Sequence, residues 1–414
     1  MLEKMKSAWR IPELRKKIIY TFGMLLLYRL LCCIPVPGVN IAAVSEAVKS
    51  FSVLDFMNMM TGGSFQNMTI MAMGITPYIN ASIILQLLTV AIPTLEKLAK
   101  EGPEGRKKIT EWTRYLTVAL AFVQAVGLVF AMRANSYGGI WYLVIGISMA
   151  AGTALAMWVG ERITENGIGN GISLLIMAGI VSNMFNWSRQ AVVGLIDGTV
   201  GIIAVLVVVL AFLVMIVAIT YVDMGERRIP VQYAKRMVGR KMYGGQSTHI
   251  PMKLNSTGVM PLIFGFAILQ FPATIFAFFP TSGINLWWQG FQSGVWYQVV
   301  LAVLIIAFTY FYTGITFNPA DISKNMQQNG GIIPGIRQGR ATTDYLARVS
   351  SRLTLFSALF LAVLATIPTI ITRLFGVSTP FAASSVLIAV SVGIETIRQI
   401  EAQMVMRHHK GFLG

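Results

Sequence analysis

The segment that decides the fold covers residues 54–88 and reads LDFMNMMTGGSFQNMTIMAMGITPYINASIILQLL. Its second half is a continuous apolar run of the kind that crosses a membrane as a helix. Its first half mixes apolar side chains with Asp55, Asn58, Gly62 and Gly63. A segment too apolar for water and too interrupted for lipid therefore stands directly before a membrane crossing. The fold must surround it with an environment that suits both kinds of side chain.

The composition places the chain in a membrane. Of its 414 residues, 55% are hydrophobic and 12% are charged, whereas a soluble domain carries about 25% charged residues. The apolar residues form blocks of about 20, the length of a spanning helix, and not the alternating segments of about ten that a membrane β-barrel needs. We therefore predict an all-α polytopic membrane protein. Its basic N-terminus leads into a first span with no cleavage site after it, so we expect that span to be retained.

Ten apolar segments predict ten transmembrane helices. The fifth segment is short, and we expect its helix to begin earlier, near Gly169. The segments cover residues 18–34, 70–92, 116–132, 140–159, 172–185, 200–222, 259–279, 295–317, 353–371 and 381–397.

Basic residues are distributed unevenly over the connecting loops. With the N-terminus placed in the cytoplasm, 28 of the 33 Lys and Arg residues lie on the cytoplasmic side and four on the other. Because Lys and Arg in short loops mark the cytoplasmic face, this bias predicts an even number of crossings with both termini in the cytoplasm. Orientation and attraction to anionic lipids explain the net charge of +16. Arg29 alone lies well inside a span, where snorkelling to the interface and a functional role both remain open.

The sequence holds no catalytic or metal-binding pattern. It lacks HExxH, GxSxG and a phosphate loop, and its two cysteines, Cys32 and Cys33, are adjacent with no histidine nearby. We interpret the glycine-rich GIGNGIS at residues 167–173 as a tight turn into a helix, where backbones approach closely. The predicted spans are nearly free of the acidic residues that ion-coupled transporters carry. We therefore predict no enzyme activity, no cofactor and no energy coupling within this chain.

Two cytoplasmic loops, residues 221–256 and 317–351, are much longer than connectors need to be. Each mixes basic residues with apolar and aromatic ones, and this favours docking surfaces over solvated connectors. The apolar and aromatic residues are Ile229, Val231, Tyr233 and Tyr243 in the first loop and Ile332, Ile333, Ile336 and Tyr345 in the second.

Five long blocks of sequence follow one another in a fixed order. They are IPVPGVN (34–40), GGSFQNMTIMAMGITPYINASIILQLLT (62–89), GERITENGIGNGIS (160–173), ERRIPVQYAKRMVGRKMYGGQSTHIPMKLNSTGVMPLIF (226–264) and GIIPGIRQGRATTDYLARVSSRLT (331–354). In these blocks the chain closely resembles the bacterial SecY family, whose members form the centre of the preprotein translocation channel. The resemblance extends from the first span to the C-terminal tail.

The resemblance implies an architecture. The ten helices would form two pseudo-symmetric halves of five, residues 18–186 and 187–400, around an hourglass-shaped pore, with cytoplasmic tails at 1–17 and 401–414. Residues 54–69 would form a re-entrant plug helix in the outer funnel. This gives the opening segment a place, since non-helical backbone at membrane depth is tolerated only inside protein or beside a water-filled cavity. The residues alone fit an extracellular loop with one amphipathic turn equally well.

The resemblance also implies a ring of isoleucines at the waist of the pore, with the plug packed beneath it. Stiff, branched, apolar side chains there would reject ions and still yield to a passing chain. Spacing alone shows only that the pairs in segments two and five each lie on one helix face. The ring isoleucines are Ile75, Ile79, Ile172, Ile176, Ile263 and Ile388. The plug residues are Leu54, Phe56, Met57, Met60, Gly62 and Gly63, with Asp55, Asn58, Gln66 and Asn67 expected to face the watery funnel.

Two further sites follow from the same resemblance. Segments two and three would meet segments seven and eight at a lateral gate toward lipid, with Asn80 and Gln86 on one side and Gln270 and Phe271 on the other. Buried amides satisfied by a neighbouring helix are the alternative. The two large loops would dock a motor ATPase and the ribosome, and Arg337 would be most critical for motor coupling. The other docking candidates are Arg227, Arg228, Lys235, Arg236, Arg240 and Arg340.

The implied function is a passive, gated channel for secretory proteins across, and membrane proteins into, the bacterial plasma membrane. Its expected partners are a SecE-like clamp subunit, a SecG-like accessory subunit, the SecA motor ATPase, the ribosome, signal-sequence-bearing polypeptides and anionic lipids. A secondary transporter of a small solute is the alternative function class. That alternative needs intramembrane ion ligands and leaves the two large loops without a role.

Overall fold

The computed structural model describes residues 9, 11–41, 44–45, 58, 61–131, 138–198, 201–233, 236–238, 241–243, 247–277, 283–375 and 383–410. Some predicted site residues lie outside this part of the chain, namely Leu54, Phe56, Met57 and Met60 of the plug and Lys235 and Arg240 of the docking set. For Arg236, Gln270 and Phe271 the structure describes the backbone alone.

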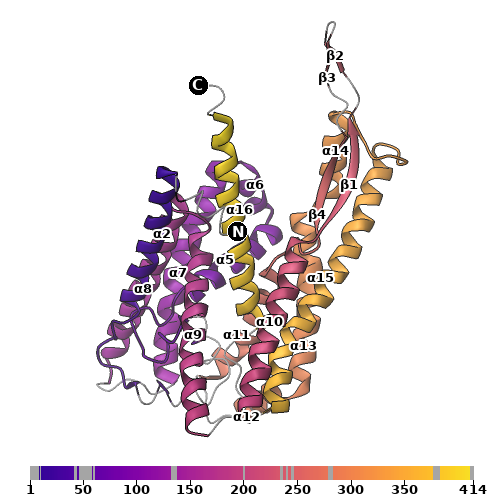
Figure 1. Ribbon diagram of the computed structural model, residues 1–414. Helices are drawn as coiled ribbons and strands as arrows, with labels where there is room; N and C mark the ends of the chain where they lie inside the picture. Colours follow the sequence, from indigo (N-terminus) through magenta and orange to yellow (C-terminus); the bar gives the residue numbers. More distant parts are fainter. Residues whose placement is uncertain are drawn as a thin grey trace.

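Helices dominate the structure, and each of the ten predicted segments overlaps one long helix (Figure 1). Within the described residues, α7, α8, α9, α10, α13 and α15 are long and apolar enough to cross a membrane. The number becomes seven if α5 and α6, which meet at a bend of 107°, count as one broken span. A helical fold is confirmed, and the number of ten crossings stays a prediction. The long helices are α2 (Pro12–Leu31), α5 (Thr76–Ala91), α7 (Pro103–Ala131), α8 (Trp141–Asn166), α9 (Gly171–Ile196), α10 (Ile202–Met224), α11 (Met260–Ala277), α13 (Val295–Thr316), α15 (Arg340–Phe375) and α16 (Ala383–Lys410), and the shorter ones are α6 (Pro93–Lys100), α12 (Gly283–Ser293) and α14 (Pro319–Gln328).

Several helices differ from their predicted bounds, for example α7 and α15, which begin before their apolar segments, and two of the differences bear on the candidate pore. The second segment was expected to be helical from residue 70, but α5 begins at Thr76, and residues 62–75 form turns instead. The helix of the fifth segment was expected to begin near Gly169, and α9 begins at Gly171, but it extends to Ile196, eleven residues beyond the predicted end of the segment at residue 185. This helix runs without interruption through the predicted boundary between residues 186 and 187. Polar residues such as Asn183 and Asn186 shortened the apolar run in the sequence, although they do not interrupt the helix.

The long helices pack in two groups. Helices α2, α5, α7, α8 and α9 contact one another, and so do α10, α11, α13, α15 and α16. The two groups meet where α9 packs on α16 and where α7 touches α11. Figure 1 shows α16, in yellow, between α9 and α10. Each group has an apolar core of its own, one around Phe65 and Met149 and the other around Leu301 and Leu361.

The large loops contain strands that the sequence analysis did not predict. Strands β1 (Glu226–Tyr233) and β4 (Ser247–Lys253) pair in antiparallel fashion, and β5 (Gly331–Ile332) pairs with the other edge of β1. A separate two-stranded ribbon, β2 (Arg236–Val238) and β3 (Lys241–Tyr243), extends beyond them. Figure 1 shows the strands and α14 projecting from the same end of the molecule as the C-terminal part of α16. Both large loops therefore belong to one small folded unit.

Candidate pore and docking surface

The segment before α5 is enclosed by protein. Its side chains Phe65, Met68 and Met73 are at most 1% exposed, and they pack against residues of α7 and α8 such as Val129 and Met149. The backbone bonds to the chain that follows α2, since the Val36 amide donates to the Met68 carbonyl at 2.9 Å and the Ile70 amide to the Ile34 carbonyl at 2.9 Å. Irregular backbone at membrane depth needs such enclosure, so the segment has the surroundings that its mixed composition demands.

A tight turn lies at the start of this segment. Gly62 and Gly63 have φ angles of +66° and +89°, the left-handed region that glycine adopts without cost. The Gly63 amide donates to the Asn58 carbonyl at 2.9 Å, and the Gln66 amide donates to Asn58 Oδ1 at 3.0 Å. The expectation that Asn58 faces water is therefore wrong, because its amide group closes the turn and the residue is 8% exposed. Asn67 is exposed, as expected.

The structure brings all six predicted ring isoleucines together. They come from α9, α11, α16 and the start of α5, and they belong to one apolar cluster. Ile75, Ile176 and Ile388 are buried, and the other three are partly buried. Residues from both halves of the chain thus converge at one place between the two helix groups. The clustered ring isoleucines are Ile75, Ile79, Ile172, Ile176, Ile263 and Ile388.

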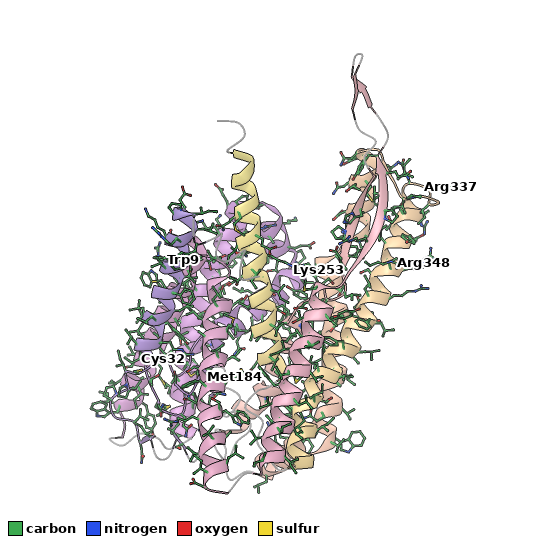
Figure 2. The ribbon with its side chains drawn as sticks, viewed as in Figure 1. Trp9, Cys32, Met184, Lys253, Arg337 and Arg348 are labelled. Atoms are coloured by element: carbon green, nitrogen blue, oxygen red, sulfur yellow. The ribbon has the colours of Figure 1, made fainter. Side chains whose placement is uncertain are left out.

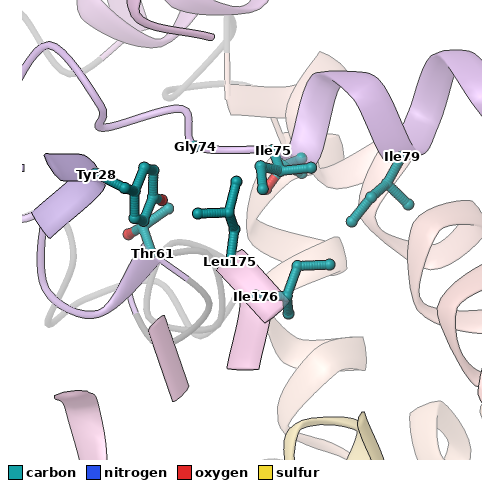
Figure 3. A pocket seen from close by; sticks show the side chains of 8 residues that line it. Tyr28, Thr61, Gly74, Ile75, Ile79, Leu175 and Ile176 are labelled. Atoms are coloured by element: carbon teal, nitrogen blue, oxygen red, sulfur yellow. The ribbon is translucent and has the colours of Figure 1, made fainter. Parts of the chain in front are cut away.

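Thr61 connects the turn at Gly62 to this cluster. Together with Tyr28, Leu175, Ile75 and Ile176 it lines a small cavity, about the size that one water molecule needs. Figure 3 shows Tyr28 and Thr61 on one side of Leu175, and Ile75 on the other. The buried Thr61 also approaches Gly74, where an added Cβ would lie 3.0 Å from the Thr61 Cγ2. The turn therefore lies beside the ring isoleucines and shares a cavity with Ile75 and Ile176.

The glycine-rich turn at residues 167–173 sets the start of α9 and thereby the position of Ile172 and Ile176. Asn170 caps the helix, since its Oδ1 accepts from the amides of Ile172 at 3.1 Å and Ser173 at 3.3 Å. Gly171 has no room for a side chain, because an added Cβ would lie 1.9 Å from the carbonyl oxygen of Gly160 on α8. The interpretation as a tight turn into a helix with close backbone approach is confirmed.

A partly buried hydrogen-bond network joins the base of the strands to α15 and α16, and the sequence analysis did not predict it. Asp223, at the end of α10, accepts hydrogen bonds from Asn255 at 3.0 Å and from Ser391 on α16. Asn255 in turn accepts from Ser357 on α15 at 3.2 Å. Sequence could offer only one signal, an isolated acid at the end of a long apolar segment, because the partners lie 32 and 168 positions away. The network links the projecting loops to the helix that carries Ile388.

The predicted lateral gate falls on a seam between the two helix groups. Helix α7 contacts α11 there, while α5 packs on α7 and α11 packs on α13. Asn80 is half-buried and Gln86 is exposed on α5. Two residues after Gln270, Pro272 lies inside α11, where it removes one helical hydrogen bond. The seam therefore includes a weakened helix.

The apolar residues of the large loops form a core and not an exposed patch. Ile229 and Val231 of β1 are buried together with Ile333, and they pack against Met326 on α14 and Leu346 on α15. The expectation that these three residues belong to a docking surface is therefore wrong, because they hold the two loops together. Tyr233 and Ile332 are exposed on the neighbouring strands β1 and β5.

Basic side chains cover the outside of this unit. Arg227, Arg228 and Arg340 are exposed, and Arg228 pairs with Glu226 at 2.6 Å. Arg337 lies in a loop between Gly335 and Gly339, whose φ angles are +81° and +88°. Its carbonyl accepts from the Thr342 hydroxyl at 2.8 Å, so the loop is tethered while the guanidinium extends outward (Figure 2). A fixed backbone with a free charged side chain suits recognition of a partner.

Within the described residues, no three His, Cys, Asp or Glu side chains come together as metal ligands would. Cys32 is buried at the end of α2 and Cys33 is exposed, and neither forms a disulfide. The geometry thus offers an apolar waist and a basic surface as its candidate sites.

Known proteins are similar to this chain in sequence and in fold. A model of the SecY family matches residues 69–397. The protein translocase subunit SecY of Mycobacterium tuberculosis (strain ATCC 25618 / H37Rv) is 42% identical over 448 residues, covering all of both chains. A SecY structure, solved to study how the plug domain stabilises the closed state of the translocation channel, has a TM-score of 0.69 at 21% identity, covering 94% of this chain and 92% of the other. Sec61 from the canine ribosome–channel complex has a TM-score of 0.67 at 19% identity, covering 94% and 93%. The matches at the level of sequence show that the chain belongs to the SecY family.

Proposed function

We propose that this chain forms the pore of a protein-conducting channel in the bacterial plasma membrane. As a SecY family member, it is a subunit of such a channel. In this proposal it is a passive, gated conduit for secretory proteins across the bilayer and for membrane proteins into it. Family membership does not support the alternative of a small-solute transporter.

One observation carries the proposal, namely the convergence of the six ring isoleucines from four parts of the chain. An apolar constriction holds back water and ions because it offers them no hydrogen bonds. It recognises no particular side chain for the same reason, so any extended polypeptide can pass once the helices separate. Branched isoleucines have few rotamers and would close again around a passing chain.

Closure would depend on the plug and opening on the lateral gate. Thr61, next to the turn at Gly62 and Gly63, lines one small cavity with Ile75 and Ile176, and this supports a plug that seals the waist from one side. The contact between α7 and α11 is the seam that would open toward lipid. A signal sequence would compete there with helix packing that Pro272 weakens.

The driving force would come from partners that dock on the basic loop unit. Its exposed arginines, with Arg337 foremost, would meet acidic residues of a SecA-type motor or phosphates of ribosomal RNA. SecE-like and SecG-like subunits and anionic lipids would complete the complex, and both termini would lie in the cytoplasm. The joining of both loops through β1 and β5 supports one docking surface for both partners.

Reconstitution tests the proposal. The channel complex that contains this chain is placed in proteoliposomes with the motor ATPase, and protease protection of a secretory precursor is measured. We expect ATP-dependent uptake of the precursor and no uptake of the same polypeptide without its signal sequence. Saturable uptake of a small solute without precursor uptake would contradict the proposal and favour a transporter.

A further inference from the structure

Arg29 points into the protein and not toward the membrane surface. It lies in the last turn of α2, and its guanidinium donates a hydrogen bond from Nη2 to the carbonyl of Ala178 on α9. The residue is only partly exposed. An arginine near the end of a membrane helix that has no partner inside the protein extends its side chain to the interface, where water solvates the charge. Arg29 instead crosses from one helix to another.

The turn at Gly62 passes through the place where these two helices meet. An added Cβ at Gly62 would lie 2.8 Å from Arg29 Nη1 and 2.8 Å from the carbonyl oxygen of Gly179. The guanidinium and the backbone of α9 therefore both approach the turn closely at the position where a side chain of residue 62 would begin. At Gly63, the same added atom would come no closer than 3.8 Å to its nearest neighbour, the Nδ2 of Asn186. Of the two glycines in this turn, only Gly62 therefore fits closely against its neighbours.

The chemistry of arginine suits this position. The planar guanidinium carries five N–H donors, so one side chain can bond to α9 through Nη2 while Nη1 lies close to the neighbouring turn. Its charge also lies at the C-terminal end of α2, where the helix dipole favours a cation. A hydrogen bond from a charged donor in an apolar region is stronger than a neutral one. Replacing Arg29 therefore removes a charge-assisted hydrogen bond to α9 in addition to the packing of its side chain.

We propose that Arg29 is a positioning residue that latches the turn at Gly62 against α9 and so keeps the channel closed. The inference rests on the proposed function and adds a specific holding contact to it. When α2 and α9 separate, Arg29 loses its hydrogen bond to the Ala178 carbonyl, and the guanidinium and the α9 backbone no longer lie close to Gly62. Thr61, next to that turn, then leaves the cavity that it lines with Ile75 and Ile176.

The test compares variants in proteoliposomes that contain the channel complex without a motor, with leakage of a trapped small dye as the measurement. Arg29→Met and Gly62→Ala are each expected to raise the leak rate about tenfold, the ratio that loss of one charge-assisted hydrogen bond gives. Arg29→Lys keeps the charge but loses the planar fork, and we expect an intermediate leak rate.

Two matched controls isolate the latch. Gly63→Ala has the same left-handed strain as Gly62→Ala but meets no close neighbour, so its leak rate should stay near that of the wild type. Arg189→Met removes an exposed charge from the outer part of α9, and it should not leak either. The double variant of Arg29→Met and Gly62→Ala should leak no more than either single variant, because both break one contact.

Three results would overturn the latch. They are an Arg29→Met leak rate no higher than that of Arg189→Met, equal leak rates for Gly62→Ala and Gly63→Ala, or full additivity in the double variant. The Gly62 comparison remains decisive even if Arg29→Met does not fold. Motor-driven precursor uptake in the same proteoliposomes separates this inference from the proposed function. Failure of the latch leaves wild-type uptake intact, whereas failure of the channel function abolishes uptake in every sample.

Discussion

Single glycines set how closely α8 and α9 approach, and this contact fixes the position of two ring isoleucines. The added Cβ at Gly171 would overlap the carbonyl oxygen of Gly160, and an added Cβ at Gly160 would lie 2.9 Å from Ile172 Cγ1. Backbone atoms cannot move aside by changing a rotamer. The two helices must separate to admit any side chain at Gly171, and the register of Ile172 and Ile176 would change with them.

We therefore predict that Gly171→Ala lowers the free energy of unfolding by about 1–3 kcal/mol, the usual result of overpacking. Gly393→Ala in α16 is the matched control, because nothing lies within 4 Å of the added methyl group. It should raise the stability by roughly 0.5–1 kcal/mol through better helix propensity. Thermal unfolding of the two purified variants in detergent measures both changes, and equal behaviour would refute the close-contact explanation.

A second prediction at the residue scale concerns the ring isoleucines and the ion leak of the closed channel. Replacing Ile176 and Ile388 together by serine puts two hydroxyl groups into a buried apolar waist, and we expect ions to leak through the closed channel. Ion conductance across planar bilayers is the measurement. The control pair, Ile196→Ser and Ile370→Ser, changes isoleucines that are 78% and 51% exposed on α9 and α15. Conductance at the control level would show that these residues do not form the constriction.

The strands, α14 and the start of α15 show how elements from distant parts of the chain make one surface. Strand β1 takes β4 on one edge and β5 on the other, and the buried residues Ile229, Val231 and Ile333 hold them together. This rigid base holds the loop of Arg337 at a fixed place. If a partner docks here as proposed, the surface is already ordered, so binding costs little conformational entropy.

For this surface we predict that Arg337→Glu reduces motor-driven precursor uptake about tenfold or more, because like charges at a docking contact cost several kcal/mol. The variant should still insert into the membrane and fold, since the side chain is exposed. Arg348→Glu, an equal charge reversal on an exposed residue of α15, is the control and should have a smaller effect. Equal losses in both variants would indicate that only the net charge matters.

At the scale of the whole molecule, the prediction concerns which end of the molecule lies on each side of the membrane. The basic bias of the loops predicts that the strand unit lies in the cytoplasm and the end of α9 outside. In a variant without Cys32 and Cys33, an Ile196→Cys substitution should react with a membrane-impermeant maleimide in intact cells. An Ile332→Cys substitution should react only after the cells are permeabilised. Both residues are exposed, so access and not burial decides the result. The opposite pattern of labelling would reverse the orientation.

Sequence alone determined the helical membrane class and the approximate position of all ten long segments. Apolar runs of about 20 residues have few stable alternatives to helices. It also located the turn before α9, because close backbone approach selects glycine. The ring isoleucines came from a resemblance, since their spacing shows one helix face and no partner across the pore.

Tertiary structure alone decided which residues meet. The burial of Asn58, the inward direction of Arg29 and the network around Asp223 all depend on partners distant in the chain or on the way that a turn closes. The strands of the large loops likewise escaped prediction, because β1 gains its buried face from α14 and α15, which follow about a hundred residues later. Local patterns specify the elements of this protein, and only the packing of distant segments brings together the isoleucine cluster, the contacts of Arg29 and the joined loop unit.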